Sequence, residues 1–250
     1  MTWGAASRPD TNQEVPMSAK IRPLIMMEVL LLAALAMSVK AVFGLVAWRY
    51  AGPLTLLVLL SGLTVYFKAR GLSWREYGLV RLPKLKSWLL LPFQSLLAVI
   101  AILGTGVAAA SLGGALGFEF MTQEPEGVMD RFGAVADGSL PHYLLWLAIA
   151  IFAAGLGEEL FFRGYLINRL KDGLGGGGFM TALTIILPAL YFGYGHVYYQ
   201  GLRGLIVTGL IGLMLGVLFV LYKRNLWPLI IAHAVVDSLV FTALFFQLDV

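Results

Sequence analysis

The chain has 250 residues, of which 59% are hydrophobic and 13% are charged, and its mean hydropathy is +0.83. A soluble domain is roughly half apolar and about a quarter charged, so this chain has too few charges to coat a globule in water. The sequence has no cysteine, which excludes a disulfide framework, a thiolate metal site and a cysteine nucleophile. The net charge of +4 does not indicate a nucleic-acid partner, because the basic residues fall in short loops between apolar runs.

Apolar runs dominate the chain after a polar N-terminal tail at residues 1–23. A spanning helix needs about 20 mainly apolar residues, and seven runs meet or approach this length. An eighth span arises if the long third run is broken near Gly104 and Gly106. We therefore expect an all-α, polytopic transmembrane helix bundle that forms a single domain over residues 24–250. The expected spans are Leu24–Trp48, Pro53–Phe67, Trp88–Leu116, Tyr143–Phe162, Phe179–Tyr194, Gly204–Tyr222 and Leu226–Phe246.

Charges in the loops predict the orientation of the bundle. Residues 68–86 carry six basic residues and one acidic residue, whereas residues 118–141 carry five acidic residues and only Arg131 as a base. Positively charged loops stay in the cytoplasm. We therefore expect a multi-pass protein of the cell membrane with a cytoplasmic N-terminus and an outer C-terminus. Other basic residues that support this orientation are Arg163, Arg169, Lys171, Lys223 and Arg224.

Two glycine patterns predict local structure rather than chemistry. Residues 173–178 predict a helix stop and a flexible connector, because no strand precedes them and no Lys-Ser/Thr follows, as a phosphate-binding loop requires. Gly209, Gly212 and Gly216 form a stripe of small residues, which predicts close helix packing by the sixth span.

Six ionisable side chains lie within or at the edge of apolar spans, where inserting a charge costs on the order of a few kcal/mol. Such groups persist when they pair with one another, line water or take part in chemistry. Five of the six follow residue 157, and this clustering is the main indication of function. The six are Glu28, Glu158, Glu159, His196, His233 and Asp237.

The first polar element is Glu158-Glu159-Leu-Phe-Phe-Arg163. On a helix Glu159 and Arg163 share a face and can pair, whereas Glu158 points about 100° away and is left to face something else. An unpaired carboxylate in an apolar environment suits a general base that works near neutrality. A structural reading, in which a salt bridge closes the helix end and a spare glutamate faces the interface, stays open.

The other polar elements are Phe192-Gly-Tyr-Gly-His196 and His233-Ala-Val-Val-Asp237. Because His233 and Asp237 are four residues apart, the carboxylate can fix the orientation of the imidazole. The alternatives are that His196 is an interfacial hydrogen-bonding residue and that the His233–Asp237 pair joins two helices. Function is the preferred reading for the pair, because both residues lie deep in an apolar run.

Residue counting predicts a difficulty in joining these elements. His196 lies near the outer end of its span, and His233 lies one or two turns from the cytoplasmic end of its own. Straight helices keep the two apart, unless residues 173–178 lie deep in the protein or Pro188 and Gly193 interrupt the fifth helix.

Together these elements offer carboxylates, histidines and an arginine on three helices, a set that suits water activation and attack on an amide. The sequence has no HExxH motif and no GxSxG motif, so the usual zincin spacing and the nucleophile elbow are absent.

The ordered motifs resemble those of the CAAX-protease and bacteriocin-processing (CPBP, or Abi) family of intramembrane endopeptidases, which includes the type II CAAX prenyl endopeptidase. That family has EExxxR, FxxxH and HxxxN or HxxxD on successive transmembrane helices. This chain has Glu158-Glu159-x-x-x-Arg163, Phe192-x-x-x-His196 and His233-x-x-x-Asp237. The resemblance covers roughly residues 143–240, which we take as the catalytic core region.

The resemblance implies an intramembrane protease and a role for each matching residue. Glu158 would activate the attacking water, and His196 would help to hold it. Glu159 and Arg163 would brace the helix and tune the site.

His233 and residue 237 would stabilise the oxyanion. Family members with asparagine at this position have an amide donor, so Asp237 here must either be protonated or act by orienting His233. A zinc ion held by Glu158, His196 and His233 is the alternative to a metal-free site. We favour the metal-free, glutamate-dependent reading and expect no cofactor.

Two other functions compete with a protease. Intramembrane acids and histidines also build proton relays in ion-coupled carriers, but carriers often repeat their polar interruptions in both halves, and the first half here has only Glu28 and Lys40. A non-catalytic relative that binds a partner, as in bacteriocin immunity, is the other alternative. The expected partners are the lipid bilayer and a peptide or membrane-protein substrate, such as a peptide precursor, rather than a prenylated CAAX tail.

Overall fold

The computed structural model describes residues 21–248, so the predictions for residues 1–20 and for the last two residues lie outside the described residues. The regular elements in the described part are all helices, which confirms the all-α class. In chain order they are α1 (Pro23–Ala47), η1 (Trp48–Tyr50), α2 (Ala51–Ala69), α3 (Leu85–Ala115), η2 (Glu119–Met121), α4 (Glu126–Ala136), α5 (Leu140–Ile149), η3 (Ala150–Ile167), α6 (Asn168–Leu174), α7 (Gly178–Leu221) and α8 (Trp227–Phe245).

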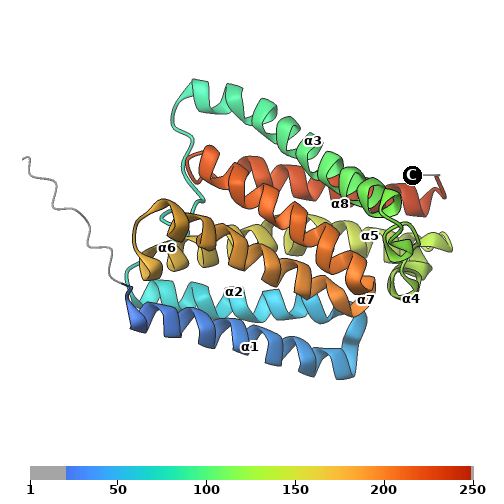
Figure 1. The fold of residues 1–250 in the computed structure, drawn as a ribbon, viewed down its shortest axis with the longest axis horizontal. Helices are drawn as coiled ribbons and strands as arrows, with labels where there is room; N and C mark the ends of the chain where they lie inside the picture. Colours follow the sequence, from blue (N-terminus) through green and yellow to red (C-terminus); the bar gives the residue numbers. More distant parts are fainter. Residues whose placement is uncertain (1–20, 249–250) are drawn as a thin grey trace, which may run out of the picture.

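Within the described residues, five helical stretches are long and apolar enough to cross a membrane, so the protein is a polytopic helical membrane bundle. Two of the five reverse direction. The stretch Pro23–Ala69 turns at η1, so that α1 and α2 lie side by side, and α7 turns back on itself (Figure 1). The turn in α7 is at Gly201, where φ 57° and ψ −148° suit glycine alone. Each of the seven predicted spans thus has a helical counterpart, while the number of membrane crossings stays a prediction.

Three predictions about the spans need correction. The third span is not broken, because α3 runs without interruption through Gly104 and Gly106. The fourth does not end at Phe162, because α5, η3 and α6 form one helical stretch from Leu140 to Leu174. Arg163 and Arg169 therefore lie inside a helix rather than in a loop, and they carry no information about orientation. The connector predicted at residues 173–178 is present, since Gly175 and Gly177 have positive φ between α6 and α7.

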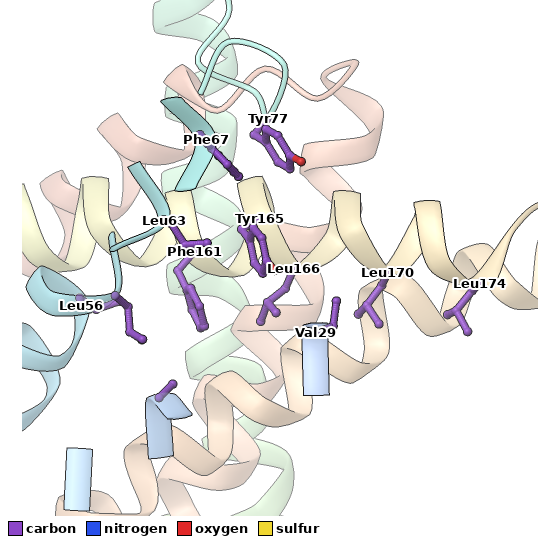
Figure 2. Close-up of a cluster of buried hydrophobic side chains, with 12 residues drawn as sticks. Val29, Leu56, Leu63, Phe67, Tyr77, Phe161, Tyr165, Leu166, Leu170 and Leu174 are labelled. Atoms are coloured by element: carbon purple, nitrogen blue, oxygen red, sulfur yellow. The ribbon is translucent and has the colours of Figure 1, made fainter. Parts of the chain in front are cut away.

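The two larger apolar clusters of the bundle both include residues of η3. The first joins α1 and α2 to η3 and α6, with Tyr165 of η3 between its neighbours Phe67 of α2 and Phe161 of η3, each ring centre 6.3 Å from that of Tyr165 (Figure 2). The second joins η3 to α3, α7 and α8 through Leu160 and Ile167 of η3. The central helix of the bundle is therefore the one that carries Glu158 and Glu159.

Glu28 belongs to this framework and lies apart from the other five intramembrane ionisable residues. Its carboxylate accepts hydrogen bonds from the Tyr165 hydroxyl at 2.7 Å and from Arg169 Nε at 3.0 Å. Glu28 thus ties α1 to η3 and α6. This pairing with Arg169 explains how a carboxylate persists in the first apolar run without a role in chemistry.

Candidate functional site

The residues 158–163 lie on η3, an 18-residue π-helix. In a π-helix each amide bonds to the carbonyl five residues earlier, and such stretches are rare and often mark functional sites. Gly155 sets the distance between η3 and α8, since a Cβ built there would lie 2.7 Å from the Cβ of Ala234. This close approach places the carboxylates of η3 beside His233 of α8.

Glu159 is the central acceptor of the site and is fully buried. Its Oε1 accepts a hydrogen bond from Arg163 Nη1 at 2.9 Å and another from His233 Nδ1 at 2.8 Å. The predicted Glu159–Arg163 pair is therefore present. Because a carboxylate only accepts, His233 carries its hydrogen on Nδ1. Glu159 Oε2 has no hydrogen-bond partner among the described residues.

Arg163 connects three helical segments. Besides Glu159, its guanidinium donates to the carbonyl oxygen of Gly212 at 3.2 Å and lies 4.8 Å from the centre of the Phe192 ring. The second arm of α7 supplies Gly212, and the first arm supplies Phe192. The buried cation therefore fixes η3 against both arms of α7.

Glu158 and Asp237 face His233 from the other side of its ring. Nε2 of His233 lies 3.7 Å from Glu158 Oε2 and 3.8 Å from Asp237 Oδ2. The Glu158 and Asp237 side chains are 19% and 34% exposed, against 0% for Glu159. The short bond that orients His233 comes from Glu159, and not from Asp237 as the four-residue spacing suggested.

His196 lies next to this group without bonding to it. Its Nδ1 bonds to the Phe192 carbonyl oxygen of its own helix at 2.8 Å. The Phe192 ring lies near both histidines, 4.7 Å from the His196 ring and 6.2 Å from the His233 ring, measured between ring centres. Because a carbonyl only accepts, Nδ1 of His196 is the donor and Nε2 is left free to accept.

Neither of the two expected ways to join the histidines occurs. The α7 helix continues through Pro188 and Gly193, and its non-helical residue is Gly201. Gly173 and Leu174 are buried at the end of α6, but residues 176–178, which lead into α7, are exposed. The first arm of α7 instead extends past the predicted end at Tyr194, and this extension carries His196.

Two cations that sequence reasoning did not assign to the site lie close to it. Lys40 of α1 donates to the carbonyl oxygen of Gly195, next to His196. Arg131 of α4 lies 4.4 Å from the centre of the Tyr199 ring, which in turn is 5.9 Å from the His196 ring. The sequence held a signal for both, since Lys40 is a lone base in an apolar run and Arg131 a lone base in an acidic loop.

The zinc alternative, with Glu158, His196 and His233 as the ligands, stays a prediction. Within residues 21–248, no three histidine or acidic side chains are placed so that they could hold one ion. Glu158, His196 and His233 are included in that statement. Glu158 lies near Nε2 of His233, at 3.7 Å. His196, in contrast, packs against the apolar ring of Phe192.

Comparison with known proteins identifies this region. Residues 140–239 match the model of the type II CAAX prenyl endopeptidase Rce1-like family. The match contains Glu158, Glu159, Arg163, His196, His233 and Asp237. It confirms the resemblance predicted from the motifs for this part of the chain, and it supports an intramembrane CAAX-type protease in general. Searches of curated proteins and of solved structures found no match.

Proposed function

Starting from the Rce1-like character of residues 140–239, we propose that this chain is an intramembrane endopeptidase in which Glu158 activates the attacking water. The observation that carries this proposal is the contrast between two adjacent carboxylates. Glu159 is sealed and bonded to Arg163 and His233, whereas Glu158 is partly exposed and its closest charged contact is 3.7 Å away. A contact of that length leaves Glu158 able to bond a water molecule.

In the proposed reaction, Glu158 takes a proton from water as the water oxygen bonds to the carbonyl carbon of the substrate. The carbonyl π electrons move to its oxygen. Glu158 then gives the proton to the amide nitrogen as the C–N bond breaks, which releases a carboxylic acid and an amine. Each proton and electron pair is accounted for within the site, as general acid–base catalysis requires.

His233 is the proposed oxyanion donor. Glu159 accepts from its Nδ1 and so stabilises a positively charged ring, whose Nε2–H then donates to the negative oxygen of the intermediate. Asp237, 3.8 Å from Nε2, shares that task if it is protonated. His196 is proposed to accept a hydrogen bond from the other hydrogen of the water at its free Nε2, which directs the water oxygen at the substrate.

We further propose that the reaction is glutamate-dependent and needs no metal. Among the described residues, no three histidine or acidic side chains are placed so that they could hold one ion, and Glu159 is already bonded to Arg163 and His233. The proposed substrates are peptides or membrane-protein segments that reach the site from the bilayer.

The test compares peptide termini in the membrane proteome of cells that express the wild type or Glu158→Gln at equal abundance. Glu119→Gln, which alters an exposed glutamate outside the site, is the matched control. We expect a defined set of new termini with the wild type and with Glu119→Gln, and its loss with Glu158→Gln. Indistinguishable sets from wild type and Glu158→Gln would contradict the proposal.

A further inference from the structure

Two cations beside the proposed site take no part in the reaction described above. Lys40 of α1 and Arg131 of α4 have no carboxylate within 4 Å in the part of the chain that the structure describes. Uncompensated charges inside a membrane protein are costly and mark ligand or ion pathways. An anionic ligand would therefore stabilise Lys40 and Arg131 in this position.

Arg131 is held rigidly but keeps most of its donors free. The residue is 8% exposed, and its Nε donates to the carbonyl oxygen of Arg49 at 2.9 Å. Its guanidinium lies 5.0 Å from the Trp146 ring centre and 4.4 Å from that of Tyr199. Its two terminal nitrogens have no hydrogen-bond partner among the described residues. They are also not fully buried, because within those residues the fully buried side-chain atom without a partner is Glu159 Oε2. The free nitrogens of Arg131 are therefore still open to the adjoining space.

Lys40 and Arg131 meet at one aromatic ring. The Lys40 ammonium lies 4.0 Å from the centre of the Tyr198 ring, and the Arg131 guanidinium lies 5.2 Å from the same centre. Lys40 also lines a cavity of about 280 Å³ between α1 and α7, together with Tyr194 and Tyr198. Both cations thus contact the helical turn that carries His196.

We infer that Lys40 and Arg131 form a subsite that binds a carboxylate group of the peptide substrate, an inference that rests on the proposed function. A guanidinium fork matches a carboxylate, and an ammonium adds a point charge. A lipid headgroup is the other anion available in a membrane. The burial of Arg131 within the bundle, against the His196 turn, favours a substrate that is bound for hydrolysis. A peptide carries a carboxylate either at its C-terminus or on an aspartate or glutamate side chain.

The test uses the full chain in phosphatidylcholine nanodiscs and a random nonapeptide library in two forms, one with a free C-terminal carboxylate and one with a C-terminal amide. A second pair of libraries, both amidated, carries either aspartate or asparagine at one fixed position. Initial rates of cleavage are measured by mass spectrometry. The variants are Lys40→Met and Arg131→Met, with Lys40→Arg and Arg131→Lys to restore charge and Arg49→Met, an exposed neighbouring arginine, as control.

We expect the wild type and Arg49→Met to cleave one carboxylate library at least about tenfold faster than its neutral partner, because a charge-assisted hydrogen bond supplies that factor. A faster rate on the library with a free C-terminus than on its amidated partner shows that the C-terminal carboxylate is recognised. A faster rate on the aspartate library than on the asparagine library shows that a side-chain carboxylate is recognised. The ratio falls to near one in both methionine variants, and it recovers in the charge-restoring variants.

A ratio near one in the wild type, or an unchanged ratio in both methionine variants, would overturn the inference. So would a preference that disappears from the wild type when phosphatidylglycerol is added to the nanodiscs, since the cations would then bind lipid headgroups. Binding of the same libraries to Glu158→Gln, measured by competition with a fluorescent peptide, separates the two proposals. Carboxylate-dependent binding without cleavage by the wild type would contradict the protease activity and support the subsite. Cleavage without a preference for the carboxylate would support the protease activity and contradict the subsite.

Discussion

Two adjacent glutamates occupy opposite environments in this protein. Glu159 is fully buried and accepts from two side chains, while the Glu158 side chain is 19% exposed and accepts no hydrogen bond from the described residues. Because the two residues are adjacent on η3, their side chains point in different directions. Glu159 points toward Arg163, and Glu158 lies on the partly exposed side of His233. Substitution of each by glutamine therefore has a different physical consequence.

Glu158→Gln is expected to lower the cleavage rate by roughly 10²–10⁴-fold, the usual contribution of a general base, with the unfolding temperature unchanged. Glu159→Gln removes the countercharge of buried Arg163 and is expected to lower the free energy of unfolding by about 3–5 kcal/mol. Thermal unfolding in detergent, followed by tryptophan fluorescence, measures the second effect beside the cleavage assay. Equal loss of stability in the two variants would contradict the assigned environments.

Metal removal provides a second test at this scale. Because the proposed mechanism activates water with Glu158 rather than with a zinc ion, treatment with 1,10-phenanthroline followed by dialysis is expected to leave the cleavage rate within about twofold of the untreated protein. Rates are compared at one protein concentration, with a known zinc peptidase as the positive control for chelation. A loss that added zinc restores would replace the glutamate-dependent mechanism with a metal-dependent one.

How far the sequence predicts this site depends on the range of each contact. The Glu159–Arg163 pair is four residues apart and follows from helix geometry alone. The His233–Glu159 bond joins residues 74 apart, and the Lys40–Gly195 bond joins residues 155 apart. Such contacts depend on how each helix is rotated and how deep it lies. An apolar sequence specifies neither, since nearly every face of it is hydrophobic.

At the scale of elements, α7 is a hairpin whose two arms touch through glycine. A Cβ built on Gly193 would meet the carbonyl oxygen of Leu205 and lie 2.9 Å from the Cα of Gly209, both on the returning arm. The glycine stripe that includes Gly209 and Gly212 is therefore a packing surface, as predicted from its spacing. This close packing positions Phe192 and His196 relative to the rest of the site.

Gly193→Ala is expected to push the two arms apart and lower the free energy of unfolding by about 1–3 kcal/mol, the usual cost of overpacking. Gly195→Ala is the matched control two residues along, where an added Cβ meets no atom within 4 Å. It is expected to be neutral or slightly stabilising, because alanine is the better helix former. Unfolding of both variants in the same detergent measures the difference, and equal stability would argue against contact between the arms.

The boundaries of elements were the less predictable part of the fold. Apolar runs located all of the long helices, but they did not reveal that the fourth continues to Leu174 or that part of it is a π-helix. Asn168, Arg169 and Lys171 look like a loop in sequence. They remain helical because Arg169 bonds to Glu28 and the Asn168 side-chain oxygen accepts a hydrogen bond from Arg224 Nη1 at 2.7 Å. Tertiary partners for polar residues thus lengthened the helix beyond its apolar run.

At the scale of the molecule, the two ends of the bundle differ in charge. Figure 1 shows the α2–α3, α6–α7 and α7–α8 connections at one end and α4 at the other. The first end carries the basic residues 68–86 and 223–224, and the second carries the acidic residues 118–141. The positive-inside rule therefore still predicts a cytoplasmic first end, without Arg163 and Arg169.

The absence of cysteine from the sequence makes this orientation directly measurable. Lys84→Cys and Asp137→Cys place single thiols in exposed positions at opposite ends. We expect a membrane-impermeant maleimide to label Asp137→Cys in intact cells or spheroplasts, and to label Lys84→Cys only after permeabilisation. The reverse pattern would invert the topology.

The length of the helical stretch from Leu140 to Leu174 has a consequence for the rate of turnover. Its 35 residues, 18 of them π-helical, are well above the roughly 20 that cross the hydrocarbon, and Glu158 lies about midway along it. Under the proposed mechanism, a scissile bond must reach Glu158 near the middle of this apolar stretch, where a helical segment keeps its amides bonded to one another. Local unwinding of the incoming segment then becomes the slow event, so glycine or proline near the cleaved bond, or a thinner bilayer, would accelerate the enzyme more than a better fit to its side chains.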